Sequence, residues 1–128
     1  MPCAYFATLG SSGWNRDLLN ESDAVVNDRI VVTRTGENNG IIDVEITNNM
    51  GMNWFFGDYW HLEVKLEDTW YRVPSKEPVF VNDIGHELAM GQSMKKSYDM
   101  NYYGELPSGR YRLIIDGSDV QGALEIDR

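Results

Sequence analysis

The side chains that could do chemistry in this chain are two histidines, one cysteine and a few acidic clusters. His86-Glu87 suggests metal binding or acid–base catalysis, but Met90 stands where a His-Glu-x-x-His zinc motif carries its second histidine. His61 alternates with Trp60 and Leu62, which predicts that it lies on the polar face of a strand. We expect both histidines to be solvated side chains without a metal or a catalytic partner.

The cysteine and the acidic clusters point to no reaction either. Cys3 is the only cysteine, so it cannot form a disulfide within the chain, and we expect it to have no catalytic role. The run Asp116-Gly117-Ser118-Asp119 is too short for an EF-hand calcium loop and lacks its later glutamate, so it predicts a hairpin turn. No nucleophile elbow, phosphate loop or dinucleotide fingerprint occurs in the sequence. We therefore predict that the protein is not an enzyme, with no catalytic residues, no metal site and no cofactor.

An aromatic segment from Met52 to Trp60 is the remaining candidate site. One interpretation is that its rings are buried and close one end of the fold. The other is that part of the segment is exposed and stacks on sugar rings or on a partner protein. Alternation places Trp60 inward, so the candidate binding residues are Trp54, Phe55 and Phe56.

Composition limits the classes of partner. The 128 residues fit one domain, and the net charge of −9 argues against nucleic acid and against an anionic membrane surface. No run of about 18 apolar residues that could span a membrane is present. We expect a protein or glycan partner, no nucleic acid and no direct membrane insertion, and we leave weak homo-oligomerisation open.

The elements that must position the aromatic segment are predicted to be strands. Apolar residues recur with period two from Ile30 onward, and turn formers separate the runs at intervals of roughly 8–12 residues. The predicted strands are Ile30–Thr33, Ile42–Thr47, Trp60–Leu66, Trp70–Val73, Val79–Val81, Met94–Met100, Arg110–Ile115 and a last one containing Leu124 and Ile126. We predict an all-β sandwich of about seven antiparallel strands over residues 30–128, with a partly irregular N-terminal extension over residues 1–29.

The expected core follows from the same alternation. Its residues are Ile42, Val44, Ile46, Trp60, Leu62, Val64, Leu66, Tyr111, Leu113, Ile115, Leu124 and Ile126. Tyr111 follows the turn Leu106-Pro107-Ser108-Gly109, as a tyrosine corner does at the entry of a late sandwich strand. We therefore predict a structural role for Tyr111 rather than a role in binding.

Four landmarks occur in a characteristic order: Asn48-Asn49, Trp70–Pro74, Asp83–Gly85 and Tyr103–Leu113. Together they resemble the bacterial immunoglobulin-like domains of secreted proteins and lipoproteins of Gram-positive gut bacteria, from about Ile30 to the C-terminus. The resemblance implies an Ig-like β-sandwich without a core disulfide, an extracytoplasmic location (secreted or anchored at the cell surface) and no catalytic residues. We expect a non-catalytic module that serves in protein interaction, in adhesion or as a spacer. The alternative is a carbohydrate-binding module that uses the aromatic segment.

Overall fold

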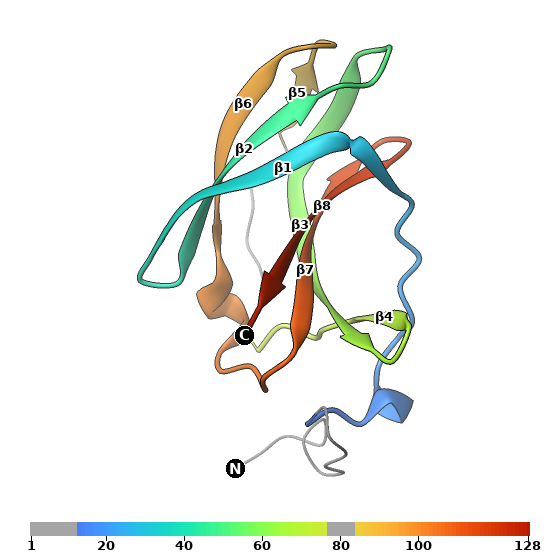
Figure 1. Ribbon diagram of the computed structural model, residues 1–128, viewed down its shortest axis with the longest axis vertical. Coiled ribbons are helices and arrows are strands. Elements are labelled where there is room, and N and C mark those ends of the chain that lie inside the picture. The colour runs from blue at the N-terminus through green and yellow to red at the C-terminus, as the bar shows by residue number, and fades with distance from the viewer. Residues whose placement is uncertain (1–12, 77–83) are drawn as a thin grey trace.

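The computed structural model describes residues 13–76 and 84–128, and these residues form two layers of β-strands (Figure 1). The strands are β1 (Val26–Asn38), β2 (Ile41–Asn48), β3 (Trp54–Leu66), β4 (Thr69–Arg72), β5 (Gly85–Leu88), β6 (Ser93–Asp99), β7 (Arg110–Gly117) and β8 (Gln121–Asp127). Two 3-10 helices, η2 (Arg16–Leu18) and η3 (Met100–Tyr103), accompany them. The all-β prediction is confirmed.

The strands join into one curled sheet in the order β4-β3-β7-β8-β1-β2-β6, with β5 added to β3. The long strand β1 connects the two layers, because it pairs with β2 along most of its length and with β8 near its start. The β1–β8 pair is parallel, so the expectation of antiparallel strands throughout is wrong at this one pair. Both strands start at the same end of the pair, because Val26, the first residue of β1, lies opposite Gln121, the first residue of β8.

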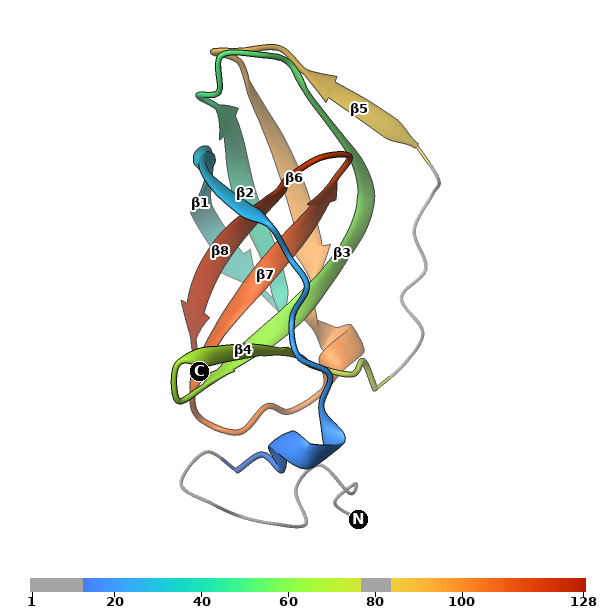
Figure 2. The same cartoon turned by 90° about the vertical axis from the view of Figure 1, so that its right-hand side faces the viewer.

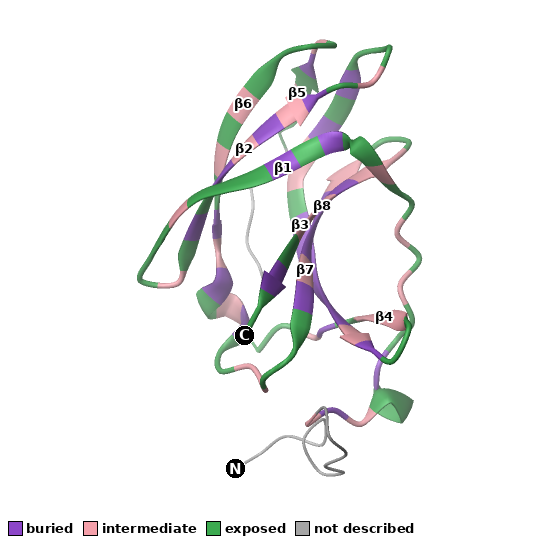
Figure 3. Cartoon of the chain, in the orientation of Figure 1, coloured by how far each residue is buried: buried purple, intermediate pink, exposed green. Residues whose placement is uncertain are grey.

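The core lies between the layers and is visible as the purple positions in Figure 3. Of the twelve predicted core residues, all are buried except Leu124, which is partly buried against the same cluster. Trp60 of β3 meets Tyr98 of β6 edge to face, with ring centroids 5.5 Å apart. Strands β3 and β6 lie near opposite ends of the sheet order, so this contact joins the two layers across the core.

Strand β3 changes neighbours along its length. Its first part pairs with β5 and its last part with β4, while β7 lies along its other edge. Phe56 is opposite Gly117 and Trp60 is opposite Ile115, so a bulge lengthens β3 between these two points. Strand β5 is not among the predicted strands, and the predicted strand Val79–Val81 lies outside the described residues.

Residues 13–25, which we call the N-terminal strap, run over the outside of the sandwich before β1 begins. Backbone hydrogen bonds join Ser22 to Trp70 and Arg72 to Asn20, so the strap first follows the free edge of β4. It then crosses in front of β7 and β8 (Figure 2). Trp14 and Leu19 are buried with the core cluster. The proposed division of the chain at residues 29 and 30 stays a prediction.

Candidate functional site

The aromatic segment forms the first half of β3, where side chains alternate between the core and solvent. Trp54 and Phe56 are 2% and 3% exposed, whereas Phe55 is 51% exposed. Trp54 and Phe56 stack with ring centroids 4.6 Å apart, and the Trp54 Nε1–H donates to the carbonyl of Val120 at 3.0 Å. Period-two alternation turns Trp54 and Phe56 into the core, as the first interpretation has it, and of the three candidate binding residues only Phe55 presents its ring to solvent.

A groove opens beside Phe55, and we call it the aromatic groove. It has a volume of about 570 Å³, and its lining includes Phe55, Tyr59 and Ile84, each about half exposed. The β3 bulge lies between Phe56 and Trp60, in the stretch of β3 that borders the groove. Glu87 and Asp116 also line the groove, so an apolar floor is bordered by carboxylates.

His86, which also lines this groove, is not the isolated histidine that the sequence suggested. It lies on β5, and its Nε2 is 2.6 Å from Asp58 Oδ1, which also accepts a hydrogen bond from Lys96 Nζ at 2.6 Å. The hydrogen bond from Lys96 lowers the pKa of Asp58 most, burial opposes this, and His86 adds to the lowering. The cluster ties β3, β5 and β6 together beneath the groove.

A second polar cluster lies under the N-terminal strap. Glu63 is fully buried, and its carboxylate receives Nε–H and Nη2–H of Arg112 at 2.7 Å, the Ser22 hydroxyl at 2.6 Å and His61 Nε2 at 2.7 Å. Burial by itself raises the pKa of Glu63, but the hydrogen bonds from His61, Ser22 and Arg112 outweigh it and lower the pKa to about 2. The Arg112 guanidinium in turn lies over the ring of Trp70 at 4.4 Å.

His61 belongs to this buried cluster, so the expectation of a solvated side chain is wrong. Alternation does turn it away from the core, but the strap and the chain after β4 cover that face, and His61 is only 5% exposed. Its Nδ1 is buried and has no hydrogen-bond partner among the described residues.

Tyr111 joins the strap to the turn before β7. Its hydroxyl donates to the carbonyl of Pro107 at 2.6 Å and accepts from Trp14 Nε1 at 3.0 Å. A bond from a tyrosine hydroxyl to the backbone a few residues upstream is the geometry of a tyrosine corner. Burial raises the pKa of Tyr111 to about 12, with the bond from Trp14 opposing the shift.

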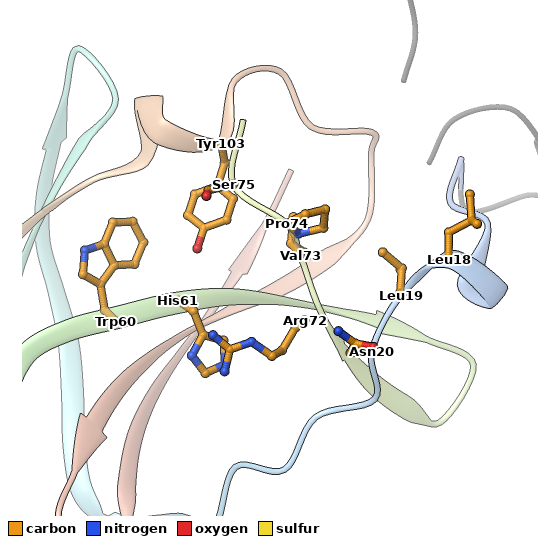
Figure 4. A pocket seen from close by; sticks show the side chains of 10 residues that line it. All are labelled: Leu18, Leu19, Asn20, Trp60, His61, Arg72, Val73, Pro74, Ser75 and Tyr103. Atoms are coloured by element: carbon orange, nitrogen blue, oxygen red, sulfur yellow. The ribbon is translucent and has the colours of Figure 1, made fainter. Parts of the chain in front are cut away.

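A third feature, which we call the edge pocket, lies where the chain leaves β4 and uncovers the edge of β3 (Figure 4). Its volume is about 370 Å³, and its lining comes from the strap, from β3, from the end of β4 with the chain after it, and from η3. The residues labelled in Figure 4 are Leu18, Leu19, Asn20, Trp60, His61, Arg72, Val73, Pro74, Ser75 and Tyr103.

The family follows from a sequence comparison. The family model described as "Bacterial Ig-like domain" matches residues 26–121 of the 128. The chain belongs to this family. The resemblance to bacterial Ig-like domains and the Ig-like β-sandwich fold are thereby confirmed. No curated protein and no solved structure matches the chain.

The described part of this bacterial Ig-like domain offers binding surfaces more readily than reactive groups. Within residues 13–76 and 84–128, no group of three or more His, Cys, Asp or Glu side chains could hold a metal ion. Neither short helix in that part of the chain is long or apolar enough to cross a membrane. The family is generally non-catalytic, which agrees with a domain whose ionisable clusters are used in internal ion pairs.

Sequence reasoning missed several residues of the aromatic groove and of the buried polar cluster. Tyr59 lies in the aromatic segment and was not named as a candidate, although the alternation that places Trp60 inward places Tyr59 on the outward face. Ile84 joins the groove only through the pairing of β5 with β3. Alternation with Leu62 and Val64 places Glu63 on the outward face of β3, and nothing in a local pattern indicates that a distant segment covers it.

Proposed function

We propose that this bacterial Ig-like domain is a non-catalytic module of an extracytoplasmic protein and that it binds a partner protein at the aromatic groove. One observation carries the proposal: Phe55, Tyr59 and Ile84 are each about half exposed around the same hollow. Clustered exposed apolar residues mark interaction surfaces, and aromatic side chains dominate binding energy there. Members of this family are usually extracellular, which supports the location.

The charge of the groove suggests the chemistry of the partner. Glu87 and Asp116 line it, and the whole chain carries a net charge of −9. A complementary segment places an apolar side chain between Phe55 and Tyr59 and a lysine or arginine beside the two carboxylates. Adhesion or a spacer role in a larger protein is compatible with such a contact.

Selection of peptides from a random displayed library tests the proposal. Selected peptides should combine an aromatic or aliphatic anchor with a basic residue. Truncating a central aromatic residue typically costs about 2 kcal/mol or more, so Phe55→Ala should weaken binding by about 30-fold. Met90→Ala is the matched control, because Met90 is exposed but does not line the groove. Equal binding by the two variants would count against the groove.

A second candidate function is carbohydrate binding, favoured by the combination of exposed rings with carboxylates in one groove. Aromatic faces stack on sugar rings, and Glu87 and Asp116 can accept hydrogen bonds from hydroxyl groups. A glycan array with the wild type, Phe55→Ala and Met90→Ala distinguishes the two functions. A glycan signal that only Phe55→Ala loses favours the carbohydrate, and peptide binding without any glycan signal favours the protein partner.

A further inference from the structure

Strand β6 has one edge without a partner strand. It is the last strand in the sheet order, and among the described strands it pairs with β2 alone (Figure 1). The pairing is regular over Ser93–Asp99. At its ends, Met100 N–H donates to the Gly40 carbonyl at 2.8 Å, and Asn48 N–H donates to the Gln92 carbonyl at 3.0 Å. Residues of antiparallel strands alternate between hydrogen-bonded and non-hydrogen-bonded pairs, so the even-numbered residues of β6 bond to β2 and the odd-numbered residues direct their N–H and C=O groups outward.

The outward backbone groups of β6 bond to no residue of 13–76 or 84–128. Proteins commonly protect such an edge with proline, a bulge or an inward-pointing charge, because it accepts a strand of another chain. Strand β6 contains no proline and no bulge. Its inward-pointing charge, Lys96, is neutralised by Asp58 at 2.6 Å. The backbone of this edge is therefore able to accept a further strand.

The charges along the edge make β6 complementary to a second copy of itself. Lys95 and Asp99 lie on the same face of β6, two residues to either side of Ser97. When two β6 strands pair antiparallel with Ser97 at the centre, Lys95 of each copy lies directly opposite Asp99 of the other, and opposite charges in this position stabilise a sheet. Lys95 is exposed and forms no ion pair with the described residues. Asp99 is only partly buried, and its carboxylate otherwise accepts hydrogen bonds from Asn101.

The neighbouring registers lack this complementarity. Centring the pair on Lys95 places the two Lys95 side chains opposite each other. Centring it on Lys96 places the two Lys96 side chains opposite each other on the inner face. Like charges directly opposite destabilise a strand pair, so the charges select the register centred on Ser97.

We propose that the domain forms a weak symmetric dimer in which the free edges of two β6 strands pair antiparallel about Ser97. Lys95, Ser97 and Asp99 of each copy exchange backbone hydrogen bonds with Asp99, Ser97 and Lys95 of the other. An edge-to-edge contact of this length is smaller than the ~1,200–2,000 Å² of stable interfaces, so we expect a Kd of about 0.1 mM. No residue of β6 lines the aromatic groove, so this dimer does not depend on the function proposed for the groove.

Analytical ultracentrifugation of the full chain tests the dimer in about 0.15 M NaCl, which screens the repulsion between two acidic molecules. The average mass should rise from that of one chain at about 10 µM toward that of two chains at about 1 mM. Ser97→Pro removes an outward N–H at the centre of the contact and leaves the bonds to β2 in place, so this variant should stay monomeric at about 1 mM. Ser97→Ala is the matched control: both variants lose the hydroxyl bond to Asp43, but Ser97→Ala keeps the N–H and should dimerise as the wild type does.

An exchange of charges tests the register. Lys95→Glu and Asp99→Lys each place like charges opposite one another, so each should raise the Kd about tenfold or more. An equimolar mixture of the two variants restores both pairs of opposite charges and should dimerise about as well as the wild type. Lys65→Glu makes the same change of charge on β3 and should leave the Kd unchanged.

Three results would overturn the proposal. They are a mixture that dimerises no better than its components, equal dimerisation of Ser97→Pro and Ser97→Ala, and a wild-type chain that stays monomeric at about 1 mM. The last result would make a strand of another protein the alternative occupant of the edge.

Discussion

At the scale of single residues, Tyr111 links two segments through one hydroxyl group. Tyr111→Phe removes the donor to the Pro107 carbonyl and the acceptor for the Trp14 indole N–H, so each of these two groups loses its bond to the hydroxyl. An unmet buried polar group costs about 1–3 kcal/mol, so we expect the free energy of unfolding in urea to fall by about that amount. Tyr102→Phe is the matched control, because the Tyr102 hydroxyl forms no hydrogen bond with the described residues. Equal losses in the two variants would contradict a structural role for the Tyr111 hydroxyl.

Glu63 makes the stability of the domain depend on pH. Its pKa is about 2 in the folded chain against an ordinary value of 4.5, so its ionised form stabilises the fold above about pH 4.5. That contribution, about 3 kcal/mol by linkage, is lost as the pH falls from about 4.5 toward 2. Asp58, whose pKa is also lowered, acts in the same direction.

Urea unfolding of Glu63→Gln at pH 7 and at pH 3 measures this contribution. The variant should be about 3 kcal/mol less stable than the wild type at pH 7, and the difference should shrink at pH 3. Glu125→Gln removes an exposed partner of Arg110 and should change little at either pH. A difference between wild type and Glu63→Gln that is the same at both pH values would rule out the linkage.

At the scale of elements, the N-terminal strap is part of the folded domain although it precedes the family match. It supplies buried Trp14 and Leu19 to the core cluster, and Ser22 binds Glu63. A chain that begins at residue 26 should therefore melt well below one that begins at residue 13. Loss of two large buried side chains alone is worth about 3–6 kcal/mol. Equal melting temperatures of the two chains would show that the strap is dispensable.

The same elements show how far the sequence predicts this structure. Period two in β2, β3 and β7 predicts which face of each strand is buried, because neighbouring side chains must point to opposite faces. It does not predict what covers the other face, so it places His61 and Glu63 toward solvent although both are buried in the folded chain. Neither the parallel β1–β8 pair nor β5 has a local signal, since both depend on pairing between distant segments.

The candidate sites were less predictable than the fold. The aromatic segment lies on the strand that borders the groove, but Ile84 joins the lining only through the pairing of β5 with β3. The edge pocket is lined by four segments that are separate in the sequence. Such a feature exists only after folding.

At the scale of the whole molecule, the cavities differ in charge although the chain as a whole is acidic. The aromatic groove carries Glu87 and Asp116, whereas no acidic residue lines the edge pocket. The net charge of −9 therefore assists a basic partner at the groove.

This difference predicts how salt affects binding at the groove. The screening length falls from about 10 Å at 0.1 M salt to about 3 Å at 1 M, so a lysine-containing peptide should bind more slowly and more weakly as NaCl is added. Glu87→Gln with Asp116→Asn removes the charges that line the groove and should flatten this dependence in surface plasmon resonance. Asp17→Asn with Asp28→Asn is the control: it removes the same number of negative charges as the groove pair, at exposed positions outside the groove. If both double variants flattened the salt dependence alike, the long-range electrostatic field of the whole molecule, rather than the groove, would attract the basic peptide.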